Sequence, residues 1–201
     1  AIFAQSWQLL SAPSRRVLVA TPVFATSASK AAIEAASDVH TWDLDEAIGQ
    51  LVEMWLMEPG PELEEAGRRY SIHPLTRAFA ERKGREDEDE HYATHRRAAQ
   101  YFLDLLREQS ELEEQDGFER LDEERENIYT QIEWTYEATE WRLLIDYTRS
   151  IGKYLWTSGH WSDRVRYCKL GVEACRKVGD KQNLAWLLVY DLGWTVARQE
   201  H

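Results

Sequence analysis

The chain has 201 residues and a mass of 23.5 kDa, a length that predicts one or two domains. Hydrophobic residues make up 43% of the chain and charged residues 30%, which supplies a folded core and excludes a disordered polymer. The 24 basic and 36 acidic residues give a net charge of −12. This charge disfavours nonspecific binding to nucleic acid or to an anionic membrane surface.

Cysteine content and hydropathy predict a cytoplasmic protein. Cys168 and Cys175 are seven residues apart, so within one helix they would lie ~10.5 Å apart along the axis, too far for a disulfide. The most apolar early stretch, Val17 to Ala25, is interrupted by Pro22 and is much shorter than the ~20 residues of a membrane helix. The chain starts without Met and directly in helix-like sequence, so we expect a fragment of a longer protein.

Proline and charge divide the chain into three parts. All prolines lie within the first 74 residues, at positions 13, 22, 59, 61 and 74. Residues 1–83 carry 8 basic and 11 acidic side chains, residues 84–139 carry 6 and 18, and residues 140–201 carry 10 and 7. We therefore expect a first domain at 1–83, an acidic helical linker at 84–139 and helical repeats from 140 to 201.

The first part predicts three short helices. Ser11 followed by Pro13 in the first turn marks the start of one helix. Ser27 or Ser29 can cap a second helix, and Asp43 a third. The apolar stripe expected on the third helix comprises Leu44, Ala47, Ile48, Leu51, Val52 and Trp55.

A small hairpin and a further helix are expected after these helices. Pro59-Gly60-Pro61 should stop the third helix, and Tyr70-Ser71-Ile72 reads as extended chain. The spacing of Leu75, Ala78 and Phe79 predicts the buried face of a helix that ends at Lys83-Gly84. Three short helices followed by a hairpin are the order of a winged-helix domain.

The remaining residues predict consecutive antiparallel helices. The apolar patterns place them at 91–109, about 121–136, 141–157, 161–177 and from 181 onward. Gly159 and Gly179 fall between helices as C-terminal stops. Ile151-Gly152 and Leu192-Gly193, 41 residues apart, suggest paired helices in degenerate tetratricopeptide-like repeats, whose ideal period is ~34 residues. The expected fold class is mostly all-α.

Two segments carry a family resemblance. Residues 69–80, RYSIHPLTRAFA, resemble the end of the winged-helix domain in STAND-class signalling ATPases, the NB-ARC group. Leu121 to Trp134, and Tyr154-Leu155-Trp156 with Gly159 and Trp161, resemble the linker and first tetratricopeptide-like repeats of bacterial members. The resemblance implies a regulatory and sensor fragment of a nucleotide-switched ATPase, with a nucleotide-binding domain upstream.

This resemblance implies a role for His73. In the family, the corresponding histidine contacts the phosphates of bound ADP and holds the protein closed. The family often has Met-His-Asp at this point, whereas Ile72-His73-Pro74 keeps only the histidine. No G-x-x-x-x-G-K-[ST] phosphate loop is present, because the only Gly-Lys pair, Gly152-Lys153, lacks the remaining residues. We expect no enzyme activity, catalytic residue or cofactor in this chain, with ADP or ATP belonging to the parent protein.

Two other functions remain open. A winged helix can bind DNA as a transcription regulator, but residues 43–58, the candidate recognition helix, contain no Lys or Arg. A plain helical scaffold could bind peptides without a switch. His91 and His95 are spaced four residues apart, as helical metal ligands can be, but no H-E-x-x-H motif or Cys accompanies them. We expect neither metal nor nucleic acid.

Protein or peptide ligands are expected on the repeats. Candidate aromatic contacts are Trp156, Trp161 and Trp194, although tryptophans between helix pairs more often fill the core. The helix from Lys181 carries apolar residues on more than one face, including Leu188 and Val189. An outer helix should be polar on its solvent side. This predicts an interrupted repeat array that can self-associate through its last helix.

Overall fold

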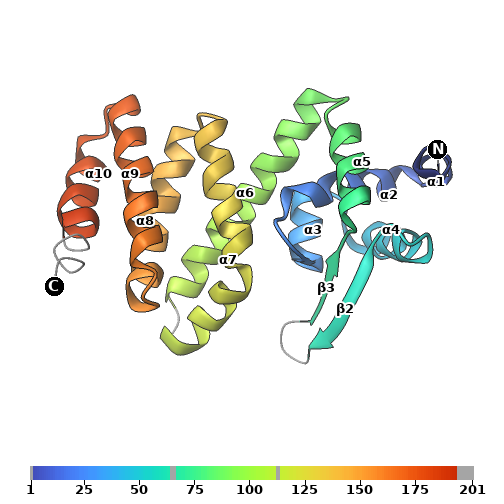
Figure 1. Cartoon of the computed structure of the whole chain (residues 1–201), viewed down its shortest axis with the longest axis horizontal. Coiled ribbons are helices and arrows are strands. Elements are labelled where there is room, and N and C mark those ends of the chain that lie inside the picture. Colours follow the sequence, from blue (N-terminus) through green and yellow to red (C-terminus); the bar gives the residue numbers. More distant parts are fainter. Residues whose placement is uncertain (1, 64–66, 112–113, 194–201) are drawn as a thin grey trace. The chain divides into compact units, whose positions relative to one another are not determined.

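The computed structural model describes residues 2–63, 67–111 and 114–193 (Figure 1). The described chain is mostly helical and contains one small three-stranded antiparallel sheet. It forms two compact units, residues 1–101 (unit 1) and 102–201 (unit 2), and the division falls inside helix α6, Glu88–Glu111. Among the helices described, none has the length and apolar character needed to cross a membrane. The domain limits expected at 83 and 139 stay predictions.

The helix starts predicted in unit 1 are largely confirmed. After α1 (Ile2–Leu9), α2 (Ala12–Ala20) begins at Ser11, whose hydroxyl accepts the Ser14 N–H at 3.2 Å. Helix α3 (Lys30–Ser37) begins at Ser29, whose hydroxyl accepts the Ala32 N–H at 3.2 Å. Each serine satisfies a backbone donor that the first turn of a helix leaves unpaired. A short 3₁₀ turn, η1 (Thr21–Val23), follows α2.

Two details predicted for the third helix are wrong. Helix α4 spans Thr41–Glu53, so Asp43 lies inside its first turn and is not the N-cap. The helix also ends before Trp55, whose side chain is 87% exposed and does not belong to the apolar stripe. Helical periodicity no longer places a side chain after the helix has ended. The buried stripe is Leu44, Ala47, Ile48 and Leu51.

The sheet contains one strand more than the expected hairpin. Strands β2 (Glu58–Leu63) and β3 (Gly67–Ser71) are the predicted pair, and β1 (Ala28–Ser29) adds to β3, giving the order β1-β3-β2. Pro59-Gly60-Pro61 therefore lies in β2, and does not itself stop α4. Prolines are tolerated there because β2 is an edge strand and its register with β3 is irregular between Pro59 and Glu62.

Helix α5 (Pro74–Gly84) ends where it was predicted to end, but it buries another face. Thr76, Phe79 and Ala80 are buried, whereas Leu75 and Ala78 are exposed. The prediction was correct only for Phe79. The first turn of α5 projects its second residue, Leu75, to the surface, where that side chain is 63% exposed.

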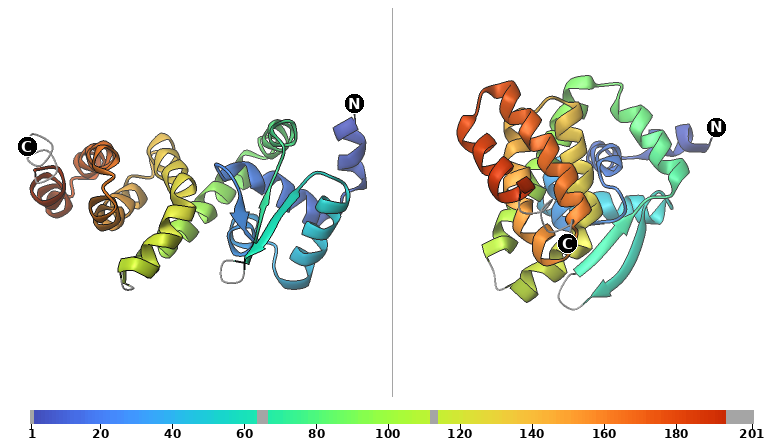
Figure 2. Two further views of the ribbon diagram at one scale, coloured as in Figure 1. Left: turned by 60° about the horizontal axis from the view of Figure 1, so that its bottom comes forward. Right: turned by 60° about the vertical axis from the view of Figure 1, so that its left-hand side comes forward.

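Unit 2 consists of the remainder of α6 and the helices that follow it. They are α7 (Glu114–Glu137), α8 (Trp141–Thr157), α9 (Trp161–Val178), α10 (Lys181–Trp186) and the π-helical segment η2 (Leu187–Gly193). Figure 2 shows α8, α9 and α10 side by side. Gly159 and Gly179 have φ of +75° and +74°, as predicted for residues that stop helices.

The core of unit 2 is rich in aromatic side chains. Tyr147, Tyr154, Tyr167 and Phe102 are among its largest fully buried residues. Ile151 and Gly152 are buried in α8, but a close approach of helices that the sequence did not predict occurs at Gly171 of α9. A Cβ atom there would lie 2.9 Å from Leu187 Cδ1. Cys168 and Cys175 are buried and are not joined by a disulfide.

Candidate functional site

His73 lies at the junction between β3 and α5, on the surface of unit 1. Its imidazole Nδ1 accepts the backbone N–H of Leu75 at 3.2 Å and thereby caps the helix. An Nδ1 that accepts a hydrogen bond leaves the proton of the neutral ring on Nε2. The ring is exposed, so this arrangement presents an Nε2–H donor to whatever approaches the start of α5.

The surroundings of His73 combine this donor with an exposed apolar side chain. Leu75, two residues further on, is 63% exposed. The preceding residue, Ile72, is buried and anchors the junction in the core. At this junction Ile72 therefore contacts the core, while His73 and Leu75 are exposed.

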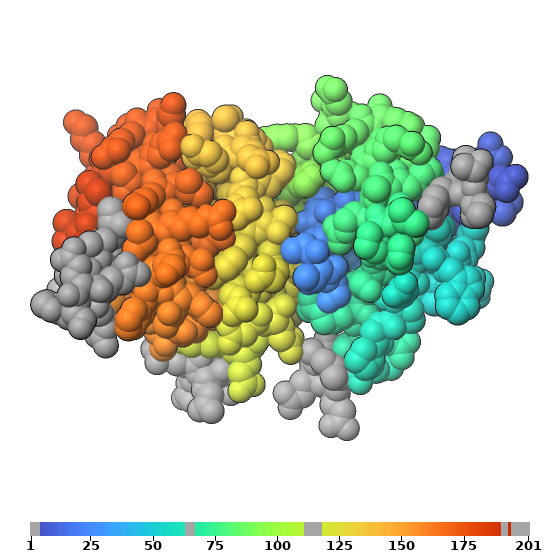
Figure 3. Space-filling model, in the orientation of Figure 1, coloured from blue at the N-terminus to red at the C-terminus, as the bar shows by residue number. Residues whose placement is uncertain are grey.

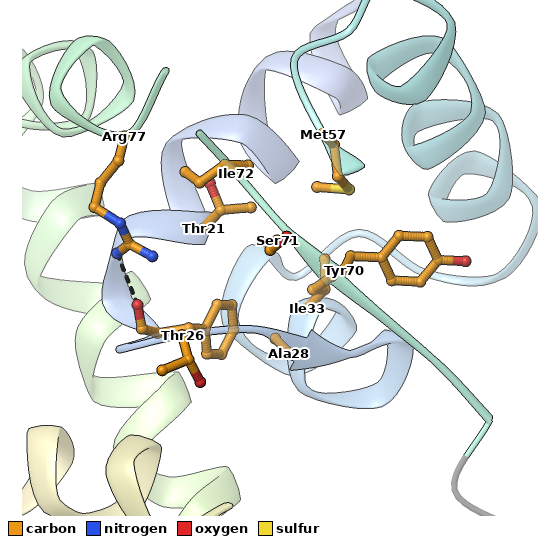
Figure 4. Close-up of a pocket in the computed structure, with 10 residues that line it drawn as sticks. Thr21, Thr26, Ala28, Ile33, Met57, Tyr70, Ser71, Ile72 and Arg77 are labelled. Atoms are coloured by element: carbon orange, nitrogen blue, oxygen red, sulfur yellow. Dashed lines mark hydrogen bonds between the residues drawn. The ribbon is translucent and has the colours of Figure 1, made fainter. Parts of the chain in front are cut away.

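Arg77 fixes α5 against the segment that follows α2. Its guanidinium Nη1 donates to the carbonyl oxygens of Pro22 at 3.0 Å and Phe24 at 2.7 Å, as Figure 4 shows for one of these contacts. Burial lowers the pKa of Arg77. The hollow beside it measures about 10 Å³, room for no more than one water molecule. Arg77 thus has a structural role, and this hollow is too small for a ligand.

A larger hollow in unit 1, of about 190 Å³, is lined by Trp7, residues of α2 and the start of α6. Two of its three cations have acidic partners, whereas Arg15 donates to the backbone carbonyls of Trp7 and Gln8. Arg16 lies 3.1 Å from a carboxylate oxygen of Asp38, and Lys83 lies 2.8 Å from one of Glu86. The walls also contribute carboxylates of their own. The hollow therefore combines acidic and basic side chains, and its charge does not select an anionic ligand.

His91 and His95 form a ring pair on α6. Their centroids are 4.8 Å apart and the rings lie edge to face. Burial, with smaller effects of the His91 and Arg85 charges, lowers the pKa of His95 to about 4, so this imidazole is neutral at physiological pH. Within the residues that the structure describes, no group of three or more His, Cys, Asp or Glu side chains could hold a metal ion.

The surface of α4, the candidate recognition helix, is acidic. Asp43, Asp45, Glu46 and Glu53 are exposed on it, and no Lys or Arg occurs from residue 43 to residue 58. The α4 and β2 segments, coloured blue-green to cyan, form part of the molecular surface in Figure 3. Phosphate contacts dominate the binding of proteins to DNA, so this face is unsuited to a DNA groove.

A seam of polar contacts joins α7 and α9 in unit 2. Each contact joins a residue of α7 to one at the start of or within α9, and the four pairs are Arg125–His160 (3.1 Å), Tyr129–Asp163 (3.0 Å), Glu133–Arg166 (2.7 Å) and Tyr136–Glu173 (3.1 Å). Residue numbers rise together along both helices, so α7 and α9 run in the same direction. The paired residues are 33 to 37 positions apart.

The seam contains a tyrosine that is held as a hydrogen-bond donor. Burial, followed by the hydrogen bond to Asp163, raises the pKa of Tyr129 far above its usual range. Its hydroxyl therefore stays protonated and donates to the Asp163 carboxylate. The Tyr129 ring also packs at 4.9 Å from that of Tyr167. These contacts fix the register between the two helices.

The tryptophans proposed as ligand contacts have mixed surroundings. Trp156 and Trp161 are both half-buried, with ring centroids 6.4 Å apart, and Trp161 Nε1 donates to the Trp156 carbonyl at 3.3 Å. The guanidinium carbon of Arg164 lies 4.8 Å from the Trp156 centroid. Trp194 lies outside the described residues. A ligand-binding role for these three residues stays a prediction.

Sequence reasoning did not single out Trp42, which is 72% exposed, and it misplaced Trp55. The position of Trp42 in the sequence could have predicted that it lies off the buried face. It lies two residues before Leu44, and residues two apart on a helix do not share a face, so Trp42 departs from the buried stripe.

Comparisons of the chain with protein-family models, with curated proteins and with solved structures give no match.

Proposed function

We propose that this chain is the regulatory and sensor part of a nucleotide-switched signalling ATPase of the STAND class. In this proposal unit 1 closes over ADP held by an upstream nucleotide-binding domain, and unit 2 binds a protein or peptide ligand that releases the closed state. The observation that carries the proposal is the exposed His73 ring, whose capping bond to Leu75 leaves an Nε2–H donor facing outward.

The arrangement of unit 1 supports a winged-helix assignment. Its elements follow the order α2, β1, α3, α4, β2 and β3, and the sheet order β1-β3-β2 places the last strand of the hairpin in the middle. A winged helix of this kind would use α4 to enter DNA if it were a transcription regulator. The acidic exposed face of α4 disfavours that alternative and favours a domain that contacts protein.

The register of α7 and α9 supports a repeat array in unit 2. Their paired residues are 33 to 37 positions apart along the chain, close to the ~34-residue period of tetratricopeptide repeats. In such an array each repeat contacts its neighbours, and equivalent helices of successive repeats run parallel. Unit 2 would then be the start of the ligand-sensing surface.

The proposed role of His73 follows from the chemistry of its free ring edge. A neutral imidazole whose Nδ1 accepts a hydrogen bond donates through Nε2, and a phosphate oxygen can accept that bond. Hydrogen bonds to charged groups contribute about 1.5–3 kcal/mol. Loss of this bond would therefore speed ADP release by about tenfold to hundredfold.

The test is the rate of ADP dissociation from the intact parent protein. His73→Ala removes both the helix cap and the phosphate donor, whereas His73→Asn keeps a good capping residue and is too short to replace the Nε2–H. We expect both variants to release ADP faster, while only His73→Ala loses stability. His40→Ala, an exposed histidine of the same unit, serves as the control and should leave ADP release unchanged.

Two results would refute the proposal. If the coding sequence upstream of Ala1 encodes no phosphate loop, the nucleotide switch fails, and the scaffold alternative replaces it. If both His73 variants release ADP at the rate of the unmodified protein, His73 is only the cap of α5.

A further inference from the structure

The outward face of α4 carries a stripe of residues unlike the rest of unit 1. Trp42, Glu46, Gly49 and Glu53 are spaced four, three and four residues apart, which places them on one side of the helix. All four are exposed. The buried residues of α4 lie on the opposite side, so this stripe faces away from the core of unit 1.

Two exposed tryptophans lie near the ends of α4. Trp42 is 72% exposed at the start of α4, and Trp55 is 87% exposed just after its end. Tryptophan is highly buried on average in folded proteins and is enriched at the centres of protein interfaces. Two nearly bare indole rings at the ends of one helix therefore indicate a surface used for contact.

The backbone at Trp55 reinforces this reading. Trp55 has φ of +57°, a left-handed conformation that glycine or asparagine usually adopts when it follows a helix. The Leu56 N–H returns to the Leu51 carbonyl at 2.9 Å, so the chain turns inward and buries Leu56 and Met57. The same turn drives the indole of Trp55 outward. A bulky residue in this conformation is strained, and such strain is concentrated at functional positions.

The charge around the two tryptophans specifies the kind of partner. Asp43, Glu46, Glu53 and Glu58 are exposed, and among the described residues none of their carboxylates forms an ion pair. Lys30 reaches the edge of this surface, where it pairs with Asp45 at 2.5 Å. Carboxylates attract Lys and Arg side chains, and an indole face binds the same cations through its π system.

We propose that the α4 face, defined by Trp42, Glu46 and Glu53 on the outward side of α4 together with Trp55 just after its end, docks a segment of a partner protein rich in Lys or Arg. The carboxylates pair with the cationic side chains, and the two indoles cover their apolar stems and stack on guanidinium groups. Nucleic acid is the wrong partner because its phosphates carry the same sign of charge. A second copy of this acidic chain is disfavoured for the same reason. The inference does not depend on the nucleotide switch.

The test uses the 201-residue protein and a defined probe. The probe is a peptide of alternating arginine and alanine with blocked ends, and the same peptide with glutamate in place of arginine is its control. Binding is measured by titration calorimetry at physiological ionic strength, where charges more than about 8 Å apart are largely screened. We expect the arginine peptide to bind and the glutamate peptide not to bind.

Matched charge reversals locate the site. Glu46→Lys with Glu53→Lys should weaken binding of the arginine peptide by about tenfold, because two attractive contacts become repulsive. Glu119→Lys with Glu123→Lys makes the same change in net charge on exposed positions of α7 and should change the affinity by about twofold or less. Circular dichroism confirms that each variant is folded.

The Trp55→Gly variant distinguishes a loss of peptide binding from a loss of folded protein. Glycine relieves the left-handed strain at this position, so the variant should be at least as stable as the unmodified protein and yet bind the arginine peptide more weakly. The proposal is overturned if the arginine peptide does not bind, or if the α7 pair weakens binding as much as the α4 pair. It is also overturned if the protein sediments as a dimer that the α4 variants dissociate, because the face would then bind a second copy.

Discussion

Substitution of Gly171 by alanine should destabilise unit 2, although alanine is the better helix former. Gly171 lies within α9, where a Cβ atom would collide with the Thr148 hydroxyl. The same atom would stand 2.9 Å from Thr148 Cβ and 2.9 Å from Leu187 Cδ1. Real Cβ atoms do not approach neighbours this closely, so α8, α9 or η2 must shift.

The expected magnitude follows from three contributions. Forcing an extra methyl group into a packed core costs about 1–3 kcal/mol. The Thr148 hydroxyl donates to the Ile145 carbonyl at 3.0 Å in a buried position, and moving it away costs about 1 kcal/mol. The higher helix propensity of alanine stabilises the helix by about 1 kcal/mol. Gly171→Ala should therefore lower the free energy of unfolding by about 1–3 kcal/mol.

Gly49→Ala is the matched control. Gly49 also lies inside a helix, but a Cβ atom there has no neighbour within 4 Å. The substitution should raise the free energy of unfolding by about 0.5–1 kcal/mol. The two variants thus make the same chemical change with opposite expected signs, and the packing around each glycine accounts for the difference.

Urea denaturation followed by circular dichroism measures both effects. A double variant, Gly171→Ala with Thr148→Ala, removes the colliding hydroxyl and methyl groups and should recover part of the lost stability, which appears as a favourable coupling in the double-mutant cycle. If Gly171→Ala proves as stabilising as Gly49→Ala, the close approach of α8 and α9 is wrong. The absence of coupling with Thr148 would place the collision elsewhere.

Three further predictions concern pH, assembly and activity. Folding lowers the pKa of His95 to about 4, below its value in the unfolded chain, so the folded state binds fewer protons. The free energy of unfolding should therefore be highest above pH 6.5 and decrease by up to about 3 kcal/mol as the pH falls toward 4. His95→Gln should flatten this dependence in urea titrations at several pH values. Leu188 and Val189 are 39% and 56% exposed and should support a concentration-dependent dimer in sedimentation, which disappears when downstream repeats are restored. A protein that stays monomeric at high concentration, and whose stability Leu188→Glu with Val189→Glu leaves unchanged, refutes this prediction. Residues 1–201 should not hydrolyse ATP, and turnover that follows the protein through purification contradicts this expectation.

The parts of the fold that sequence predicts well are those fixed by local chemistry. Ser11 and Ser29 cap their helices through hydrogen bonds from the backbone N–H three residues further on. The capping residue and its partner are close neighbours in the sequence, so a short segment is enough to predict the cap. Gly159 and Gly179 adopt positive φ where the helices stop. The long helices α8 and α9 follow from apolar periodicity sustained over four or more turns.

The errors occur where an element ends or where a distant segment decides the outcome. The assignment of Trp55 to a buried stripe extended the period of α4 by two residues past its end. Strand β1 has two residues, and its pairing with β3 joins positions 28 and 70, a contact that no local pattern encodes. Pro59 and Pro61 read as breakers because sequence does not show that β2 is an edge strand.

The same distinction governs the candidate sites. His73 was found because its sequence context is recognisable, and its outward Nε2–H depends on the bond to Leu75, a neighbour in sequence. The α4 face was missed because its meaning depends on exposure, which requires knowing that α4 packs on one side only and that the chain turns at Trp55. From the sequence alone, the acidic residues of α4 indicated only that this helix is unsuited to DNA. Trp42 on this helix and Trp55 just after its end are both exposed and suit a protein partner, so the negative charge that argues against DNA also selects a cationic protein segment.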